Sequence, residues 1–131
     1  MHLRKTLLTS VAALFLAVPA FAWAASLQVQ DVAIGTGVHE RVPMGISSYF
    51  DSSVGKLYAF TRVVGAEGDT RVYHKWYHGN DLVADVPLMV RSGDWRTWST
   101  KNVQPHWTGD WRLVVVSEDG SILETIKFAV N

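Results

Sequence analysis

Residues 70–90 read TRVYHKWYHGNDLVADVPLMV, two runs rich in β-branched and aromatic residues that are joined by Gly79-Asn80. Such runs on either side of a short glycine-containing break are typical of a β-hairpin. The second run contains Pro87, which has no N–H to give to a sheet, so this run is predicted to be an edge strand or to carry a bulge at the proline. Its alternate apolar residues are expected to share one buried face: Val86, Leu88 and Val90.

The segments on both sides of this hairpin continue the strand pattern. Downstream, strands are predicted at residues 95–103, 110–117 and 122–130, and Asp119-Gly120 between the last two favours a type I′ turn. Upstream, strands are predicted at Leu27–Ile34 and Lys56–Val64. Residues 38–55 contain Pro43, Gly45 and two Ser-Ser pairs, and they are expected to form a loop with one short edge strand near residues 46–50.

This spacing predicts an all-β fold. About seven strands with turn signals roughly every ten residues, and no helical apolar period after the first two dozen residues, favour an immunoglobulin-like antiparallel β-sandwich. Large aromatic side chains dominate the cores of small sandwiches, so the indoles of Trp76 and Trp111 are expected inside, where they can meet between the sheets. The predicted core residues are Trp76, Trp111, Leu113, Val115 and Phe128.

The first residues are typical of a secretory signal peptide. Arg4 and Lys5 precede an apolar run of roughly 12 residues, shorter than the ~20 that a membrane-spanning helix needs, and A-x-A sites follow it. Cleavage is expected after Ala22 or Ala24, which divides the chain into a leader at 1–24 and one β-sandwich domain at 25–131. The predicted location is the periplasm or the exterior, with no membrane span in the mature chain.

Charge and composition exclude nucleic acid as a partner, a disordered chain and a disulfide-stabilised fold. The 131 residues hold 12 Lys+Arg and 12 Asp+Glu, so no basic field is available for nucleic acid, and loss of the leader would leave ten cations against twelve anions. With 48% apolar residues the chain is too hydrophobic to be disordered. It contains no Cys, hence no disulfide and no acylation site, and packing alone must hold the fold.

Several short motifs resemble one bacterial family. They are Trp76-Tyr77-His78-Gly79-Asn80, Val86-Pro87-Leu88, residues 95–101 (WRTWSTK), Gly109-Asp110-Trp111-Arg112 and the terminal Gly120, Leu123 and Phe128-Ala129-Val130. From about Lys56 to Val130 the chain resembles Domain of Unknown Function twenty-nine-fourteen, most specifically in Trp-Arg-Thr-Trp-Ser followed by Gly-x-Trp. The resemblance implies a small β-sandwich domain of envelope-associated bacterial proteins. That family carries no agreed activity, so no catalytic residue is implied.

One stretch holds more aromatic and cationic side chains than a core requires. Because Trp95 and Trp98 are three residues apart, they must point to opposite faces of a strand, one toward the core and one toward solvent. An exposed indole beside a guanidinium suits a sugar ring, a planar side chain or a carboxylate. The alternative is that these residues only cover the edge of the core. The candidate binding residues are Arg91, Trp95, Arg96, Trp98, Lys101 and Trp107.

These residues predict a non-catalytic binding or adaptor module. The expected partner is an envelope protein, with an envelope polysaccharide as the alternative, since mixed Trp and Arg sets are typical of protein interfaces. A small hydrolase built on His106 and Asp110, with Ser99 as a nucleophile, is the rival from another class, although no G-x-S-x-G elbow is present. No cofactor is expected.

A metal site is not expected either. His74 and His78 stand four apart, about 13 Å on a strand, and therefore cannot share one ion by themselves. If Trp76 faces the core, His74 points the same way, and a buried, hydrogen-bonded imidazole is the favoured interpretation.

Overall fold

The structure, a computed structural model, describes residues 27–131. The predicted signal peptide, residues 1–24, lies outside this range. The described residues contain strands and no helix. The seven long strands are β1 (Gln28–Gly35), β5 (Lys56–Val64), β6 (Thr70–His78), β7 (Asp81–Val90), β8 (Asp94–Asn102), β9 (Gly109–Ser117) and β10 (Ile122–Val130), and the short ones are β2 (Gly37–His39), β3 (Val42–Met44) and β4 (Tyr49–Phe50).

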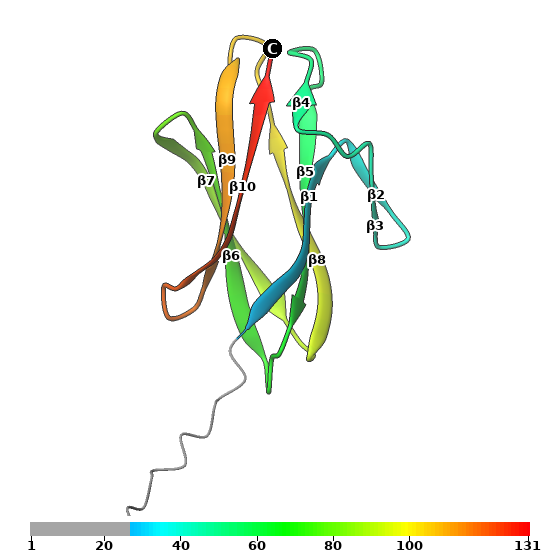
Figure 1. Ribbon diagram of the computed structural model, residues 1–131, viewed down its shortest axis with the longest axis vertical. Helices are drawn as coiled ribbons and strands as arrows, with labels where there is room; N and C mark the ends of the chain where they lie inside the picture. The colour runs from blue at the N-terminus through cyan, green and yellow to red at the C-terminus, as the bar shows by residue number, and fades with distance from the viewer. Residues whose placement is uncertain (1–26) are drawn as a thin grey trace, which may run out of the picture.

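Two sheets face each other in a sandwich, as Figure 1 shows. One has the order β1-β5-β8 and the other the order β4-β10-β9-β6-β7; every neighbouring pair is antiparallel except β10 with β4. In an immunoglobulin constant domain the fourth strand pairs with the fifth, in the first sheet. Here the corresponding strand β7 pairs with β6 instead, and β8 therefore has a strand neighbour on one side only.

The predicted long strands are confirmed to within one residue at each end. On β5, the four alternate residues Leu57, Ala59, Thr61 and Val63 share the inner face and are fully buried. Strand β7 is an edge strand, as Pro87 predicted, and its one irregularity lies opposite Trp76/Tyr77 rather than at the proline. A Pro at an edge needs no bulge when its nitrogen faces away from the neighbouring strand.

Two turns differ in type, and one prediction is wrong. Gly79 has a φ of 57° and begins a two-residue loop, which fits a type II′ turn with glycine at its first central position. The predicted type I′ turn at Asp119-Gly120 does not form, because Asp119 has no positive φ. Instead the Gly120 N–H donates to the Ser117 carbonyl (2.9 Å), and a three-residue loop closes with Gly120 at a φ of 89°. The Asp119 carboxylate accepts from the Ser117 hydroxyl and the Ser121 N–H, which favours this longer loop.

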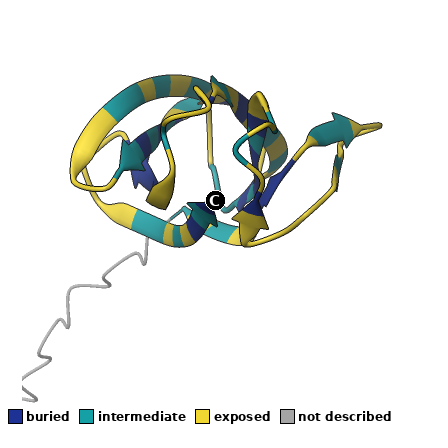
Figure 2. Cartoon of the chain, turned by 90° about the horizontal axis from the view of Figure 1, so that it is seen from above, coloured by how far each residue is buried: buried dark blue, intermediate teal, exposed yellow. Residues whose placement is uncertain are grey.

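The segment 38–55 was predicted as a loop with a short edge strand, and this is only half right. Strand β4 lies within the expected range and pairs with the end of β10. However, β2 and β3 form an additional hairpin that projects from the sandwich, as Figures 1 and 2 show. Its two-residue loop is Glu40-Arg41, and neither residue is one that turn chemistry would point to.

The core lies between the two sheets. Trp76 and Trp111 are almost fully buried, as are Leu113, Val115 and Phe128. The two indoles do not stack on each other: the Phe128 ring lies beside both, edge-on to Trp76 at 6.2 Å and stacked on Trp111 at 5.9 Å. All three side chains belong to the five-stranded sheet, and they face the three-stranded sheet across the interior.

Candidate binding surface

The structure divides the six predicted binding residues between three places. Trp95 lies on the inner side of β8 and packs against the core. Trp107, in the loop before β9, packs against the core as well. Lys101 extends over the Trp107 ring, with its Nζ 5.1 Å from the ring centroid. Arg91 is exposed in the turn between β7 and β8. The outer face of the three-stranded sheet therefore receives the remaining two, Arg96 and Trp98.

Arg96 and Trp98 lie beside two residues of β5 that were not among the predicted binding residues. Across β5 and β8, Phe60 pairs with Trp98 and Arg62 pairs with Arg96. Trp98 is 37% exposed, whereas Phe60 on the same outer face is only 4% exposed. Phe60 is thus covered by its neighbours rather than by the core of the sandwich.

The β2–β3 hairpin lies close to Phe60, because β2 contacts β5. Phe60, Arg96 and the hairpin residues Arg41, Val42 and Pro43 all line one hollow of about 310 Å³, together with Asp31, Val32, Ala33 and Ile46. A second hollow of about 380 Å³ is lined by Arg41, Asp94, Trp95, Arg96 and Trp98. Both hollows are lined by Arg41 and Arg96, so the two hollows adjoin at these residues.

Sequence reasoning missed the hairpin because its turn carries no signal. Pro43 and Gly45 favour a loop, and Glu40-Arg41 lacks the Asn or Gly that a two-residue hairpin turn prefers. The one available hint is the alternation of apolar residues at Val42, Met44 and Ile46, each of which is about half exposed or more. Four of the eight exposed large apolar side chains in residues 27–131 lie between 42 and 49, so this segment is the most apolar part of the described surface.

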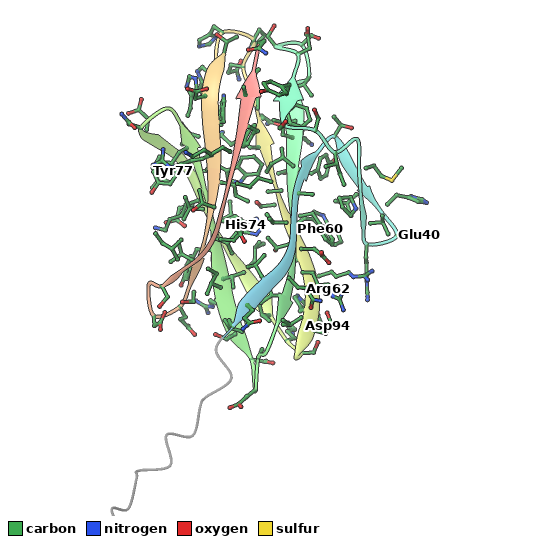
Figure 3. The ribbon with its side chains drawn as sticks, in the orientation of Figure 1. Glu40, Phe60, Arg62, His74, Tyr77 and Asp94 are labelled. Atoms are coloured by element: carbon green, nitrogen blue, oxygen red, sulfur yellow. The ribbon has the colours of Figure 1, made fainter. Side chains whose placement is uncertain are left out.

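Arg62 lies between the two carboxylates on this face and pairs with both. Its Nε and Nη2 donate to the two carboxylate oxygens of Asp94 at 2.9 and 2.7 Å, and its Nη1 lies 3.7 Å from Asp31; Figure 3 shows Arg62 beside Asp94. The hydrogen bond raises the pKa of Arg62 and lowers the pKa of Asp94, which the nearby positive charges of Arg62 and Arg96 lower further. Within residues 27–131, neither Arg41 nor Arg96 forms an ion pair.

A chain of hydrogen bonds connects buried polar groups between the sheets. The Thr61 hydroxyl donates to the Thr97 carbonyl (3.1 Å), so its oxygen must accept from the His74 Nε2–H (3.1 Å). His74 Nδ1 then accepts from the Ser99 hydroxyl (2.7 Å), whose oxygen accepts from the Trp76 indole N–H (3.0 Å). Only one neutral tautomer of His74 satisfies this order. Burial lowers the pKa of His74 to about 4.

This hydrogen-bond network includes Ser99, the nucleophile of the rival hydrolase, and His74, one of the two histidines considered as metal ligands. The Ser99 hydroxyl is buried and bonded to His74, whereas His106 and Asp110 are exposed outside that network. Both ring nitrogens of His74 have partners, and Nε2 of His78 lies 2.7 Å from the Thr108 carbonyl oxygen. The described part of the chain contains no cluster of three or more side chains that could ligate a metal ion.

These features define a class of protein: a small, mostly antiparallel β-sandwich, extended by an apolar hairpin that projects beside the outer face of its three-stranded sheet. Residues 69–130 match the family described as Protein of unknown function (DUF2914), which is the family that the motifs resemble. The resemblance is therefore confirmed for the segment that contains β6 to β10, although the match begins at 69 rather than near Lys56. A comparison with curated proteins finds no match. Residues 27–131 include no helix of the length and hydrophobicity that crossing a membrane requires.

Proposed function

We propose that the protein is an exported, non-catalytic binding or adaptor module of the bacterial cell envelope. Its working surface is the outer face of the β1-β5-β8 sheet together with the β2–β3 hairpin, and its partner is an envelope protein. The envelope location is supported by the leader-like first residues and by the family resemblance.

One observation carries the proposal. Exposed apolar residues gather on the hairpin segment, and they adjoin two arginines that have no ion pair within the described residues. Exposed apolar clusters rimmed by polar groups are typical of interaction sites, and arginine and tryptophan are the residues that most often contribute strongly to binding.

Photo-crosslinking tests the proposal with a matched control. Ile46 on the hairpin side and Ile122 near the β9–β10 turn are both exposed isoleucines, at 60% and 69%. We expect p-benzoylphenylalanine at position 46 to form a discrete adduct in cells, and the same group at position 122 to form none. Equal labelling at both positions, or none at position 46, would contradict the assignment of this face.

Two further experiments test the alternative functions, binding of an envelope polysaccharide and hydrolysis. The exposed Trp98 ring beside Arg96 is a feature that also suits an envelope polysaccharide; retention on an insoluble envelope glycan that Trp98→Ala abolishes would favour this alternative. A hydrolase would show turnover of ester or amide substrates that His106→Ala removes. Binding without turnover favours the adaptor.

A further inference from the structure

The hairpin turn holds Arg41 in an unusual backbone conformation. Glu40 and Arg41 have φ values of 49° and 61° and form the two-residue loop between β2 and β3, the arrangement of a type I′ turn. Glycine and asparagine adopt this left-handed region readily, whereas other L-residues are strained there. Within residues 27–131 these are the only non-glycine residues with a positive φ. Strain of this kind is concentrated at functional sites in proteins.

Arg41 lines both hollows described above, and so does Arg96. Glu40, by contrast, lines neither of them, and its carboxylate lies 3.8 Å from His39 Nε2; it lies at the outer end of the hairpin in Figure 3. The strained turn thus places a cation at the junction of the hollows and its neighbouring anion outside them.

The charge balance of this junction leaves room for a carboxylate. Asp31 and Asp94 are the two acidic residues that line the hollows, and both are partners of Arg62. Three guanidinium groups thus stand against two carboxylates, and the forked donors of Arg41 and Arg96 have no partner among residues 27–131. A guanidinium fork matches a carboxylate in geometry as well as in charge.

The first hollow also reaches main-chain groups at a free sheet edge. The Thr36 N–H donates to the Met44 carbonyl and the Ile34 carbonyl accepts from Ser47, so these two residues of the β1 region direct their polar groups away from β5. Main-chain groups alternate between the two edges of a strand, and Val32 therefore directs its N–H and C=O to the same free edge. Val32 lines the hollow, and neither of these groups is bonded outside the sheet ladder within residues 27–131.

From these placements we infer that the groove between the β2–β3 hairpin and β1 binds an extended acidic peptide segment of the partner. The segment pairs with Val32 through its main chain, gives a carboxylate to Arg41 and Arg96, and packs an aliphatic side chain against Val42 and Ile46. This inference rests on the proposed function and names the chemistry of the partner at the same surface.

The lining of the first hollow favours a peptide over an acidic polysaccharide. Its remaining surface comes from Ala33, Pro43 and the largely covered Phe60, in addition to Val42 and Ile46. No Asn or Gln side chain lines it. Sugar hydroxyls placed against such groups would lose their hydrogen bonds to water without replacement, which is costly, whereas an aliphatic side chain gains from the same contact.

The experiment uses a short fluorescein-labelled peptide of alternating valine and glutamate, titrated with the mature protein at low ionic strength. We expect saturable binding that weakens about tenfold when glutamine replaces the glutamates, and about tenfold in each of Arg41→Gln and Arg96→Gln. Because both arginines hold one carboxylate, the double variant should lose less than the product of the two single effects. A peptide N-methylated at alternate residues, which cannot pair with an edge, should bind more weakly.

Arg71→Gln is the matched control, since Arg71 is an exposed arginine on β6 of the opposite sheet; its affinity should equal that of the parent. Unchanged melting midpoints show that the variants are folded. Binding that survives the double variant, or no binding at all, overturns the inference, and so does binding of polygalacturonate in place of the peptide. If the adduct at position 46 forms while the peptide fails to bind, the module stands and only the partner's chemistry is wrong.

Discussion

His74 shows how a single buried side chain can make stability depend on pH. It is fully buried, and it is the one ionisable residue among the buried residues of 27–131. Protonation at Nδ1 would direct an N–H at the Ser99 oxygen, which already accepts from Trp76, and would leave the Ser99 hydroxyl hydrogen without its acceptor. Burial disfavours the charged imidazolium and is the cause of the lowered pKa of His74, and the order of hydrogen bonds around the ring fits the same neutral form.

The first prediction concerns stability in mild acid. The imidazole pKa is 6.5 in the unfolded chain and about 4 in the fold, so the unfolded state binds more protons between these values. The free energy of unfolding is therefore highest above pH 6.5, and it decreases by about 3 kcal/mol in total as the pH falls to about 4. Urea unfolding at several pH values measures this loss. His74→Gln should flatten the profile over this range, and His106→Gln, at an exposed position, should leave it unchanged.

The second prediction compares two tryptophans that differ in burial. Trp111 is 2% exposed, and its indole N–H donates to the Trp107 carbonyl at 2.9 Å. Trp111→Ala removes an aromatic core side chain, which costs about 3–5 kcal/mol of unfolding free energy. Trp98→Ala, on the outer face, should cost less than about 1.5 kcal/mol, because Trp98 is 37% exposed and its removal leaves no closed cavity in the core. Equal losses in denaturant titrations of the two variants would mean that the core is placed wrongly.

Among the elements, the long strands were predictable and the short hairpin was not. Strand β5 could be predicted with both of its faces, because Leu57, Ala59, Thr61 and Val63 alternate with bulkier or charged residues along an uninterrupted run. Hairpin β2–β3 is too short for such a pattern, and its turn residues oppose the conformation they adopt. Local propensity alone does not predict this hairpin, whose strands contact β1 and β5 and whose ends are hydrogen-bonded to the chain next to β1.

The third prediction follows from this conflict at the hairpin turn. Replacing Glu40 and Arg41 together (Glu40→Asn, Arg41→Gly) provides the residues that a type I′ turn prefers and should stabilise the hairpin by about 1 kcal/mol. The measurement is amide hydrogen exchange, which should slow roughly fivefold within the hairpin, at His39 and Met44. Asn80→Gly, a glycine substitution in the type II′ turn between β6 and β7, serves as a control and should not slow exchange in the β2–β3 hairpin. Faster exchange at these amides would show that contacts of the Arg41 side chain, and not the turn, hold the hairpin.

Considered as a whole molecule, the sandwich explains why the candidate site was only partly predictable. Period two correctly separated Trp95 from Trp98, because that rule applies within one strand. Grouping Arg41 with Arg96 requires the hairpin to lie beside the outer face of the sheet, a proximity between residues far apart in the sequence that no local pattern encodes. The same holds for Ser99, which meets His74 from the opposite sheet rather than the nearby His106.

The last prediction concerns the chain that reaches the envelope. Both proposed cleavage sites, after Ala22 and after Ala24, precede Leu27, the first described residue that packs against the core, and β1 begins at Gln28. Removal of the leader therefore leaves every strand of the sandwich intact, and the exported chain should fold without disulfides because it has no Cys. We expect the intact mass of protein from a periplasmic extract to correspond to a chain that starts at Trp23 or Ala25. The same protein carrying Arg in place of Ala22 and Ala24 should keep its leader, because these sites require small residues. Recovery of the parent from the cytoplasm with Met1 still attached would contradict export, and with it the envelope partner.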